Sequence, residues 1–202
     1  MRLVLASASP RRRQLLTAAG FSFDVVTTDV DEGRHAGETP DAYVKRLASS
    51  KSARGLELLS MRDPFANHEL VVLGADTAVV VEDDVLGKPS NEQEARRMLE
   101  RLSGRVHRVL TGLSVRTAEV ERAAVESTEV WFARLSAEDI DWYASTGEGN
   151  DKAGAYGIQG LASRFIPRIQ GSYTNVVGLP VAAVYRLLNG LGVPTDAVAS
   201  GG

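Results

Sequence analysis

The chain has 202 residues, three histidines, no cysteine and a formal net charge of -3 at pH 7. The lack of cysteine excludes disulfide scaffolds, iron–sulfur sites and thiol catalysis, and three scattered histidines argue against a histidine-based zinc site. Nucleic-acid binders usually carry a basic surplus, so the charge argues against a nucleic-acid partner. Neither a run of eighteen apolar residues nor a signal-peptide pattern is present, which predicts a cytoplasmic protein without a membrane partner.

The hydrophobic pattern predicts strands and helices that alternate along the whole chain. Strands are expected over residues 2–6, 21–27, 70–81, 85–86, 106–117, 123–135 and 165–169. Helices are expected over residues 10–19, 40–59, 91–102 and 137–145 and from Pro180, the last with Val181, Val184, Tyr185 and Leu188 on one face. Residues 29–39, 62–69 and the start of 146–160 are expected to be loops or connections. We expect a break in the third strand at 74–77 and a hairpin from the two longest strands, which is typical of a mixed α/β fold.

The first strand leads into Ser7-Ala8-Ser9-Pro10-Arg11-Arg12-Arg13, where Ser9 is expected to cap a helix that begins at Pro10. A helix start offers unpaired amides and the positive end of the dipole. Three arginines there oppose the dipole, which favours a bound anion, and hydroxyls, amides and guanidinium groups together suit a polyphosphate. The ordinary alternative is a solvated basic turn.

A carboxylate, Asp76, lies within the apolar run 71–79. Such a group is costly to bury unless it is paired or bound to a metal, and Gly74 just before it permits close approach of another group. The alternative is an aspartate at a strand end or bulge. Asp31 and Glu32 lie in a predicted loop, where acidic residues are common and carry no signal alone.

Two lysines stand at unusual positions. Lys51 is on an otherwise apolar helical face, and Lys88 lies in Gly87-Lys88-Pro89 after a strand. Each, taken alone, is typical of a surface residue with a buried stem. Together with Arg11 and Arg12 they could neutralise a triphosphate.

Glycines recur through residues 150–160, which suits either a loop that approaches a ligand or a flexible turn. Gln159 in this segment could read a base edge, because its amide is both donor and acceptor. The sequence contains no G-x-x-x-x-G-K-[ST] loop, no dinucleotide fingerprint after the first strand and no G-x-S-x-G elbow.

These residues belong to eight blocks that occur in the order of a known family: Leu5-Ala6-Ser7-Ala8-Ser9-Pro10-Arg11-Arg12, Val30-Asp31-Glu32, Leu47-Ala48-Ser49-Ser50-Lys51, Gly74-Ala75-Asp76-Thr77, Gly87-Lys88-Pro89, Leu102-Ser103-Gly104, residues 151–160, and Val177-Gly178-Leu179-Pro180. The chain thereby resembles the Maf family of nucleoside triphosphate pyrophosphatases, named after septum formation. The resemblance implies an α/β fold: a Maf/inosine-triphosphatase-like mixed twisted sheet in two lobes flanked by helices, with the active-site cleft between the lobes. We expect one such domain over residues 1–192 and a flexible tail over 193–202.

The resemblance also implies hydrolysis of a nucleoside triphosphate to the monophosphate and pyrophosphate, with Mg²⁺, Mn²⁺ or Co²⁺, in a homodimer with a house-cleaning or division-linked role. Carried over residue by residue, the resemblance implies that Asp76 is the proton acceptor and that Glu32, Lys51 and Lys88 are further catalytic residues. It also implies phosphate binding by Ser7, Ser9, Arg11 and Arg12, and metal binding by Glu32 and Asp76. Arg11, Thr77 and Gln159 match the branch that acts on dTTP and UTP, or on modified pyrimidine triphosphates.

Two other functions stay open. The first is a pyrophosphatase for a different base, and the second is a non-catalytic nucleotide-binding regulator of cell division. The complete set of charged positions argues against the regulator, because a mere binder has no need of an acid that activates water. Whether Asp76 is the base or a metal ligand is left open at this stage.

Overall fold

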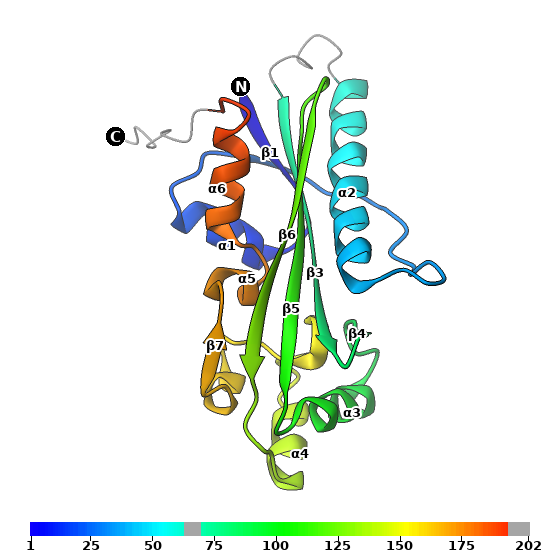
Figure 1. Ribbon diagram of the computed structural model, residues 1–202, viewed down its shortest axis with the longest axis vertical. Helices are drawn as coiled ribbons and strands as arrows, with labels where there is room; N and C mark the ends of the chain where they lie inside the picture. The colour runs from blue at the N-terminus through cyan, green and yellow to red at the C-terminus, as the bar shows by residue number, and fades with distance from the viewer. Residues whose placement is uncertain (63–69, 194–202) are drawn as a thin grey trace. The chain divides into compact units, whose positions relative to one another are not determined.

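The structure is a computed structural model that describes residues 1–62 and 70–193. It contains two compact units. Unit 1 consists of Met1–Asp76, Thr111–Glu126 and the segment from Gly178 onward, and unit 2 consists of Thr77–Leu110 and Ser127–Val177. Figure 1 labels most of their helices and strands.

The described strands form a mixed sheet, which confirms the predicted α/β class. The strand order is β2 (Asp24–Val26), β1 (Arg2–Ala6), β3 (Leu70–Val81), β5 (Val106–Arg116), β6 (Glu121–Trp131) and β7 (Arg168–Gln170), and β4 (Asp84–Leu86) pairs with β3. β1 is parallel to both β2 and β3, whereas β4 and β7 run antiparallel to β3 and β6. β5 and β6 are neighbours, as expected of the predicted hairpin.

Unit 1 carries helices α1 (Pro10–Ala18), α2 (Pro40–Arg62) and α6 (Val181–Asn189). Ser9 caps α1 as predicted, with its side chain accepting from the amide of Arg12. Thr39 plays the same part for α2, since its hydroxyl accepts the Ala42 N–H directly before Pro40 begins the helix. The core includes Leu5, Leu73, Leu113, Val184 and Leu188, all fully buried.

Unit 2 carries helices α3 (Glu92–Leu102), α4 (Ala137–Ser145) and α5 (Tyr173–Val177), and the short 3₁₀ turns η2 (Ala153–Ala155) and η3 (Leu161–Phe165). Helices α3 and α4 pack on each other. The core combines aliphatic side chains of α3 with the rings of Phe132, Tyr143, Tyr156 and Phe165. His107 lies among these rings, 2% exposed.

Several predicted boundaries were wrong. The strand expected over 21–27 is only Asp24–Val26, and β3 runs without the expected break at 74–77. The break does not occur because the Asp76 carboxylate is paired with the ammonium group of Lys51, so the strand can continue through Asp76. The strand expected over 165–169 starts only at Arg168, since Phe165 turns its ring into the core of unit 2 at the end of η3.

Other differences are smaller. Helix α2 extends to Arg62, and β6 covers 121–131 instead of 123–135. On α6, Tyr185 is 47% exposed and Ala183 is buried in its place. Helix α5 was not predicted. The predicted connection at 63–69 and residues 194–202 of the predicted tail lie outside the described residues, whereas Val193 is buried.

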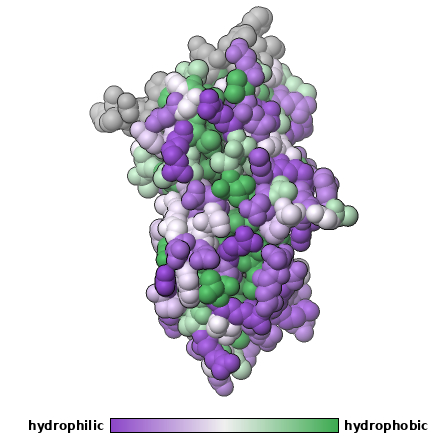
Figure 2. All heavy atoms as spheres, in the orientation of Figure 1, coloured by the Kyte–Doolittle hydropathy of each residue, from purple (hydrophilic) through white to green (hydrophobic). Residues whose placement is uncertain are grey.

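Within the described residues, no helix has the length and apolar character that crossing a membrane requires. Among these same residues, large hydrophobic residues with more than a third of their surface exposed include Met61, Trp142 and Tyr185. Figure 2 shows hydrophobic residues standing among hydrophilic ones on the face in view.

Candidate functional site

The ammonium group of Lys51 joins two carboxylates in unit 1. Its Nζ lies 2.6 Å from Oδ1 of Asp76 and 2.7 Å from Oε1 of Glu32. The side chains of Lys51 and Asp76 are 11% and 12% exposed, and that of Glu32 is 57% exposed. Taken by themselves, these three side chains carry one negative charge, and the Glu32 carboxylate is the part open to solvent. The sequence pattern marked Lys51 and Asp76, the family resemblance added Glu32, and the structure brings the three residues together.

Close packing of α2 on β3 produces this contact, and Figure 1 shows the helix lying along the strand. A Cβ on Gly74 would lie 2.2 Å from the carbonyl oxygen of Ala48 and 2.7 Å from the amide of Ser52. Side chains two residues apart on a strand point to the same face, so Asp76 points toward α2 as Gly74 does. The glycine therefore lets the helix approach until Lys51 reaches the carboxylate. The sequence predicted close approach of another group at Gly74, and the structure shows that this group is α2.

A second glycine and a polar network hold α2 on the next strand of unit 1. A Cβ on Gly112 of β5 would lie 2.1 Å from the carbonyl oxygen of Val44. The Ser49 hydroxyl donates to Glu121 at 2.6 Å, and the hydroxyls of Ser52 and Ser114 lie 2.7 Å apart. Burial alone would raise the pKa of Glu121, but hydrogen bonds from Ser49 and Ser114 hold that pKa below its usual range.

The buried guanidinium of Arg12 is directed into unit 1. It donates from Nε to the carbonyl of Gly178 at 2.9 Å, and from one terminal nitrogen to the carbonyl of Ala75 at 2.8 Å and the hydroxyl of Ser7 at 3.2 Å. Burial lowers the pKa of Arg12, while the charges of Asp76 and Glu32 act in the opposite direction. Arg12 thus places a positive charge near both carboxylates and holds the residue that precedes Asp76.

The two serines at the start of α1 have structural partners as well. The Ser7 hydroxyl accepts the Ser9 N–H at 3.2 Å, in addition to its bond from Arg12. The Ser9 hydroxyl accepts the Arg12 N–H at 3.5 Å. Arg11, which follows Pro10, is half-buried, and Arg13 is exposed. The residues predicted to bind phosphate therefore lie together at the start of α1 in unit 1.

The remaining predicted residues, Thr77, Lys88 and Gln159, belong to unit 2. Thr77 follows Asp76 in β3, and Lys88 and Gln159 are exposed. The Gly87 carbonyl next to Lys88 accepts the N–H of Gly154 at 2.9 Å. Gly154 has φ +70°, and a Cβ at this position would lie 3.0 Å from Val79. The backbone at position 154 therefore requires glycine to make the hydrogen bond to Gly87. The Lys88 segment and the glycine-rich segment of Gln159 are thus joined within unit 2.

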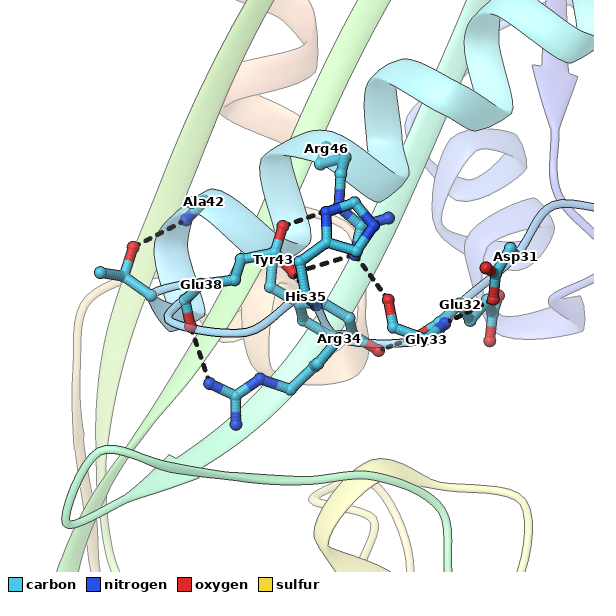
Figure 3. A network of polar contacts seen from close by, with 10 residues as sticks. Asp31, Glu32, Gly33, Arg34, His35, Glu38, Ala42, Tyr43 and Arg46 are labelled. Carbon is cyan, nitrogen blue, oxygen red and sulfur yellow. Dashed lines mark hydrogen bonds and ion pairs between the residues drawn. The ribbon is translucent and has the colours of Figure 1, made fainter.

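Sequence reasoning missed the residues that hold the loop around Glu32. Tyr43 and Arg46 of α2 contact this loop, and Arg46 pairs with Glu38 (Figure 3). Their spacing of three residues on a predicted helix next to an acidic loop was the available signal.

Helix N-termini commonly bind anions such as phosphate, and Mg²⁺ is commonly held by one or two carboxylates together with substrate phosphates. The arginine-rich start of α1 and the carboxylates of Glu32 and Asp76 therefore fit the class of α/β proteins that bind phosphorylated ligands. Comparison with known families is consistent with that class. The sequence model of the family described as Maf-like protein matches residues 2–191, and the chain belongs to this family.

Curated relatives cover almost the whole chain. A dTTP/UTP pyrophosphatase of Vibrio cholerae is 48% identical over 188 residues, which is 93% of this chain and 97% of the relative. Proteins of the same name are 49% identical in Symbiobacterium thermophilum, over 95% of both chains, and 50% identical in Anaeromyxobacter dehalogenans, over 96% of this chain and 95% of the relative. Among solved structures, the Staphylococcus aureus Ham1 protein aligns with a TM-score of 0.42 at 14% identity, over 66% of this chain and 72% of that one.

Proposed function

We propose that this protein hydrolyses dTTP and UTP to the nucleoside monophosphate and pyrophosphate. Relatives about half identical to it over nearly their full length carry the name of that activity. The observation that carries the proposal is the Lys51 ammonium held between Glu32 and Asp76. This arrangement combines a positive charge that can bind phosphates with carboxylates that can accept a proton.

In the proposed reaction, a water oxygen forms a bond to the α-phosphorus and the bond from that phosphorus to the bridging oxygen of the β-phosphate breaks. The water proton passes to Asp76, and pyrophosphate leaves with the bond's electron pair. Arg11, Lys51 and Lys88 bind the phosphates and offset the charge that develops on the leaving group. Arg12 contributes its buried positive charge, and Ser7 and Ser9 shape the helix start that faces the phosphates.

We assign selection of the base to Arg11, Thr77 and Gln159. The amide of Gln159 is exposed and carries both a donor and an acceptor, so it suits the carbonyl and N3–H edge of thymine or uracil. The homodimer implied by the family resemblance stays a prediction, and so does the cytoplasmic location predicted from the sequence.

A divalent cation fits the carboxylate pair. The described residues contain no group of three or more His, Cys, Asp or Glu side chains that could hold a metal ion, so Glu32 and Asp76 would need further ligands. Mg²⁺ is commonly held by one or two carboxylates and completed by water and substrate phosphates, which is the donor set that Glu32 and Asp76 provide. We propose that these two residues hold Mg²⁺, Mn²⁺ or Co²⁺ when the nucleotide is present. The bound cation supplies positive charge that stabilises the phosphates.

The test is product analysis in ¹⁸O-labelled water, with each canonical triphosphate supplied in turn and Mg²⁺ added. We expect the label in the monophosphate, unlabelled pyrophosphate, and the highest kcat/KM with dTTP and UTP. Label in pyrophosphate would place the attack on the β-phosphorus, and diphosphate plus phosphate would overturn the reaction. The same products with a different preferred base would overturn only the assignment of base selection.

The role of Asp76 is tested by Asp76→Asn, with Asp83→Asn as the control. Removing an essential charged group is expected to lower turnover by roughly 10²- to 10³-fold. Asp83 is a suitable control because it lies in the turn between β3 and β4 with φ +68°, a conformation that asparagine tolerates. Turnover of a folded Asp76→Asn variant near that of the unaltered protein would disprove its assignment as proton acceptor.

A further inference from the structure

The loop that carries Glu32 has no helix or strand from residue 27 to residue 39, yet polar contacts tie it to α2 (Figure 3). The guanidinium of Arg46 bonds to both carboxylate oxygens of Glu38, from Nε at 2.7 Å and from Nη2 at 2.9 Å. The same Nη2 donates to the carbonyl of Gly33 at 2.8 Å. One side chain therefore holds the two ends of the segment 33–38.

Glu32 itself is held from two sides. The hydroxyl of Tyr43 donates to its carbonyl at 3.0 Å, and the ammonium of Lys51 lies 2.7 Å from its carboxylate. The guanidinium of Arg46 also lies 5.7 Å from the centre of the Tyr43 ring, so these two side chains of α2 support each other. Helix α2 thus supplies both the partner of Glu32 and the anchors of its backbone.

The pair between Arg46 and Glu38 is well shielded for a loop contact. The side chain of Glu38 is 8% exposed and that of Arg46 is 25% exposed. Hydrogen bonding to Arg46 lowers the pKa of Glu38 to about 2, and the His35 N–H donates to the same carboxylate at 3.1 Å. A bidentate pair of this kind restricts geometry more than a single contact does, which suits a group that fixes the path of a loop.

We propose that Arg46 is a positioning residue that keeps Glu32 beside Lys51. It does so by binding the Gly33 carbonyl and the Glu38 carboxylate with one guanidinium. The inference rests on the proposed function in one respect, because that function gives Glu32 its part in the reaction. Arg46 bonds to the loop, and its effect on catalysis passes through Glu32.

The first test compares the loop in Arg46→Gln and Glu38→Gln with that in the unaltered protein, by the rate of tryptic cleavage after Arg34. Arg34 is exposed within the tied segment, so release of the segment is expected to speed cleavage at this bond by roughly 10-fold or more, as for other local openings. Arg54→Gln is the matched control, because Arg54 pairs with Glu57 on the exposed surface of the same helix. That variant is expected to be cleaved after Arg34 at the unaltered rate.

The second test is a double-mutant cycle between Arg46→Gln and Glu32→Gln in turnover at saturating dTTP and Mg²⁺. Arg46→Gln alone is expected to lower kcat by about 10- to 100-fold, the range that misplacement of a catalytic group produces. In the Glu32→Gln background the same change is expected to have no further effect. Arg46→Lys keeps the charge and is expected to recover part of the loss, and Arg54→Gln is expected to keep full activity.

Faster cleavage after Arg34 together with non-additive losses supports the proposal. Unchanged cleavage in Arg46→Gln overturns it, because Arg46 then does not hold the loop. Faster cleavage with equal losses in both backgrounds also overturns it, because the effect of Arg46 then does not pass through Glu32. A lack of turnover in the unaltered protein is a failure of the proposed function, and the cleavage rates then still decide whether Arg46 holds the loop.

Discussion

The carbonyl oxygen of Ala48 lies 2.2 Å from the point where Gly74 would carry a Cβ, so the backbone of α2 rests directly on β3. No side chain intervenes at this point. The contact sets the distance between the helix that carries Lys51 and the strand that carries Asp76, and the stability of the fold and the geometry of the site therefore depend on the same glycine.

Gly74→Ala is expected to destabilise the protein by about 1–3 kcal/mol, the usual cost of forcing an extra group into a packed interior. It is also expected to lower turnover, because α2 must move away and carry Lys51 from Asp76. Urea unfolding and dTTP hydrolysis measure the two effects. For stability the control is Gly87→Ala, where no heavy atom lies within 4 Å of the added group. Unaltered stability and turnover in Gly74→Ala would contradict the close packing of α2.

Arg12→Lys is expected to lower the free energy of unfolding by about 1–3 kcal/mol, the range for hydrogen bonds to charged groups. Lysine keeps the charge but cannot reach the carbonyls of Gly178 and Ala75 and the Ser7 hydroxyl together. Turnover is expected to fall as well, since Ala75 precedes Asp76. The neighbouring exposed Arg13 provides the control, and Arg13→Lys is expected to unfold at the same urea concentration as the unaltered protein.

His107 is expected to make stability depend on pH. Burial lowers the pKa of His107 from 6.5 to about 4, and its Nε2 lies 2.7 Å from the Tyr156 hydroxyl. Between these two pH values the unfolded chain binds a proton that the folded chain does not, so stability falls as the pH falls from about 6.5 to about 4. The full contribution is on the order of 3 kcal/mol.

The measurement is urea unfolding at several values of pH for the unaltered protein and for His107→Phe/Tyr156→Phe. The double variant removes both partners of the hydrogen bond and keeps two rings in the core, so it avoids an unpaired hydroxyl. Its stability is expected to fall less steeply with acid. His35→Gln, at an exposed histidine, is expected to keep the steep dependence. Equal slopes in all three proteins would show that His107 is not the group responsible.

Glu148 and Tyr143 are expected to influence base selection through Gln159. The Tyr143 hydroxyl donates to Glu148 at 2.9 Å and accepts the Gly157 N–H at 3.2 Å, and Glu148 accepts the Leu161 N–H at 2.9 Å. Gln159 lies between these two held amides. Tyr143→Phe and Glu148→Ala are each expected to lower the ratio of kcat/KM for dTTP over GTP by about 10-fold, the value of one lost polar contact of this strength.

Glu138→Gln is the control for these variants, because Glu138 is exposed in the first turn of α4. It is expected to leave the ratio unchanged. Equal losses of kcat/KM with dTTP and GTP in Tyr143→Phe would show that the segment affects the reaction in general and not the choice of base.

The sequence by itself determined much of the local structure. Ser9-Pro10 and Asn91 begin helices as predicted, since capping depends on residues within one turn. The turn at Glu82 and Asp83, which have positive φ angles, also falls where the polar run predicted it. Predicted strand ends failed at Phe21 and Phe165, because tertiary packing decided which apolar residues continue a ladder and which turn into a core.

For the site, the sequence identified Asp76 as a charge in an apolar strand and Lys51 as a charge on an apolar helical face. It did not determine that these two side chains pair with each other, or that Arg46 holds the loop of Glu32. Lys51 and Asp76 are 25 positions apart, and their contact exists only because Gly74 lets α2 lie directly on β3. Local patterns show which residues are costly to bury alone, and only the packing of distant segments shows which partner offsets that cost.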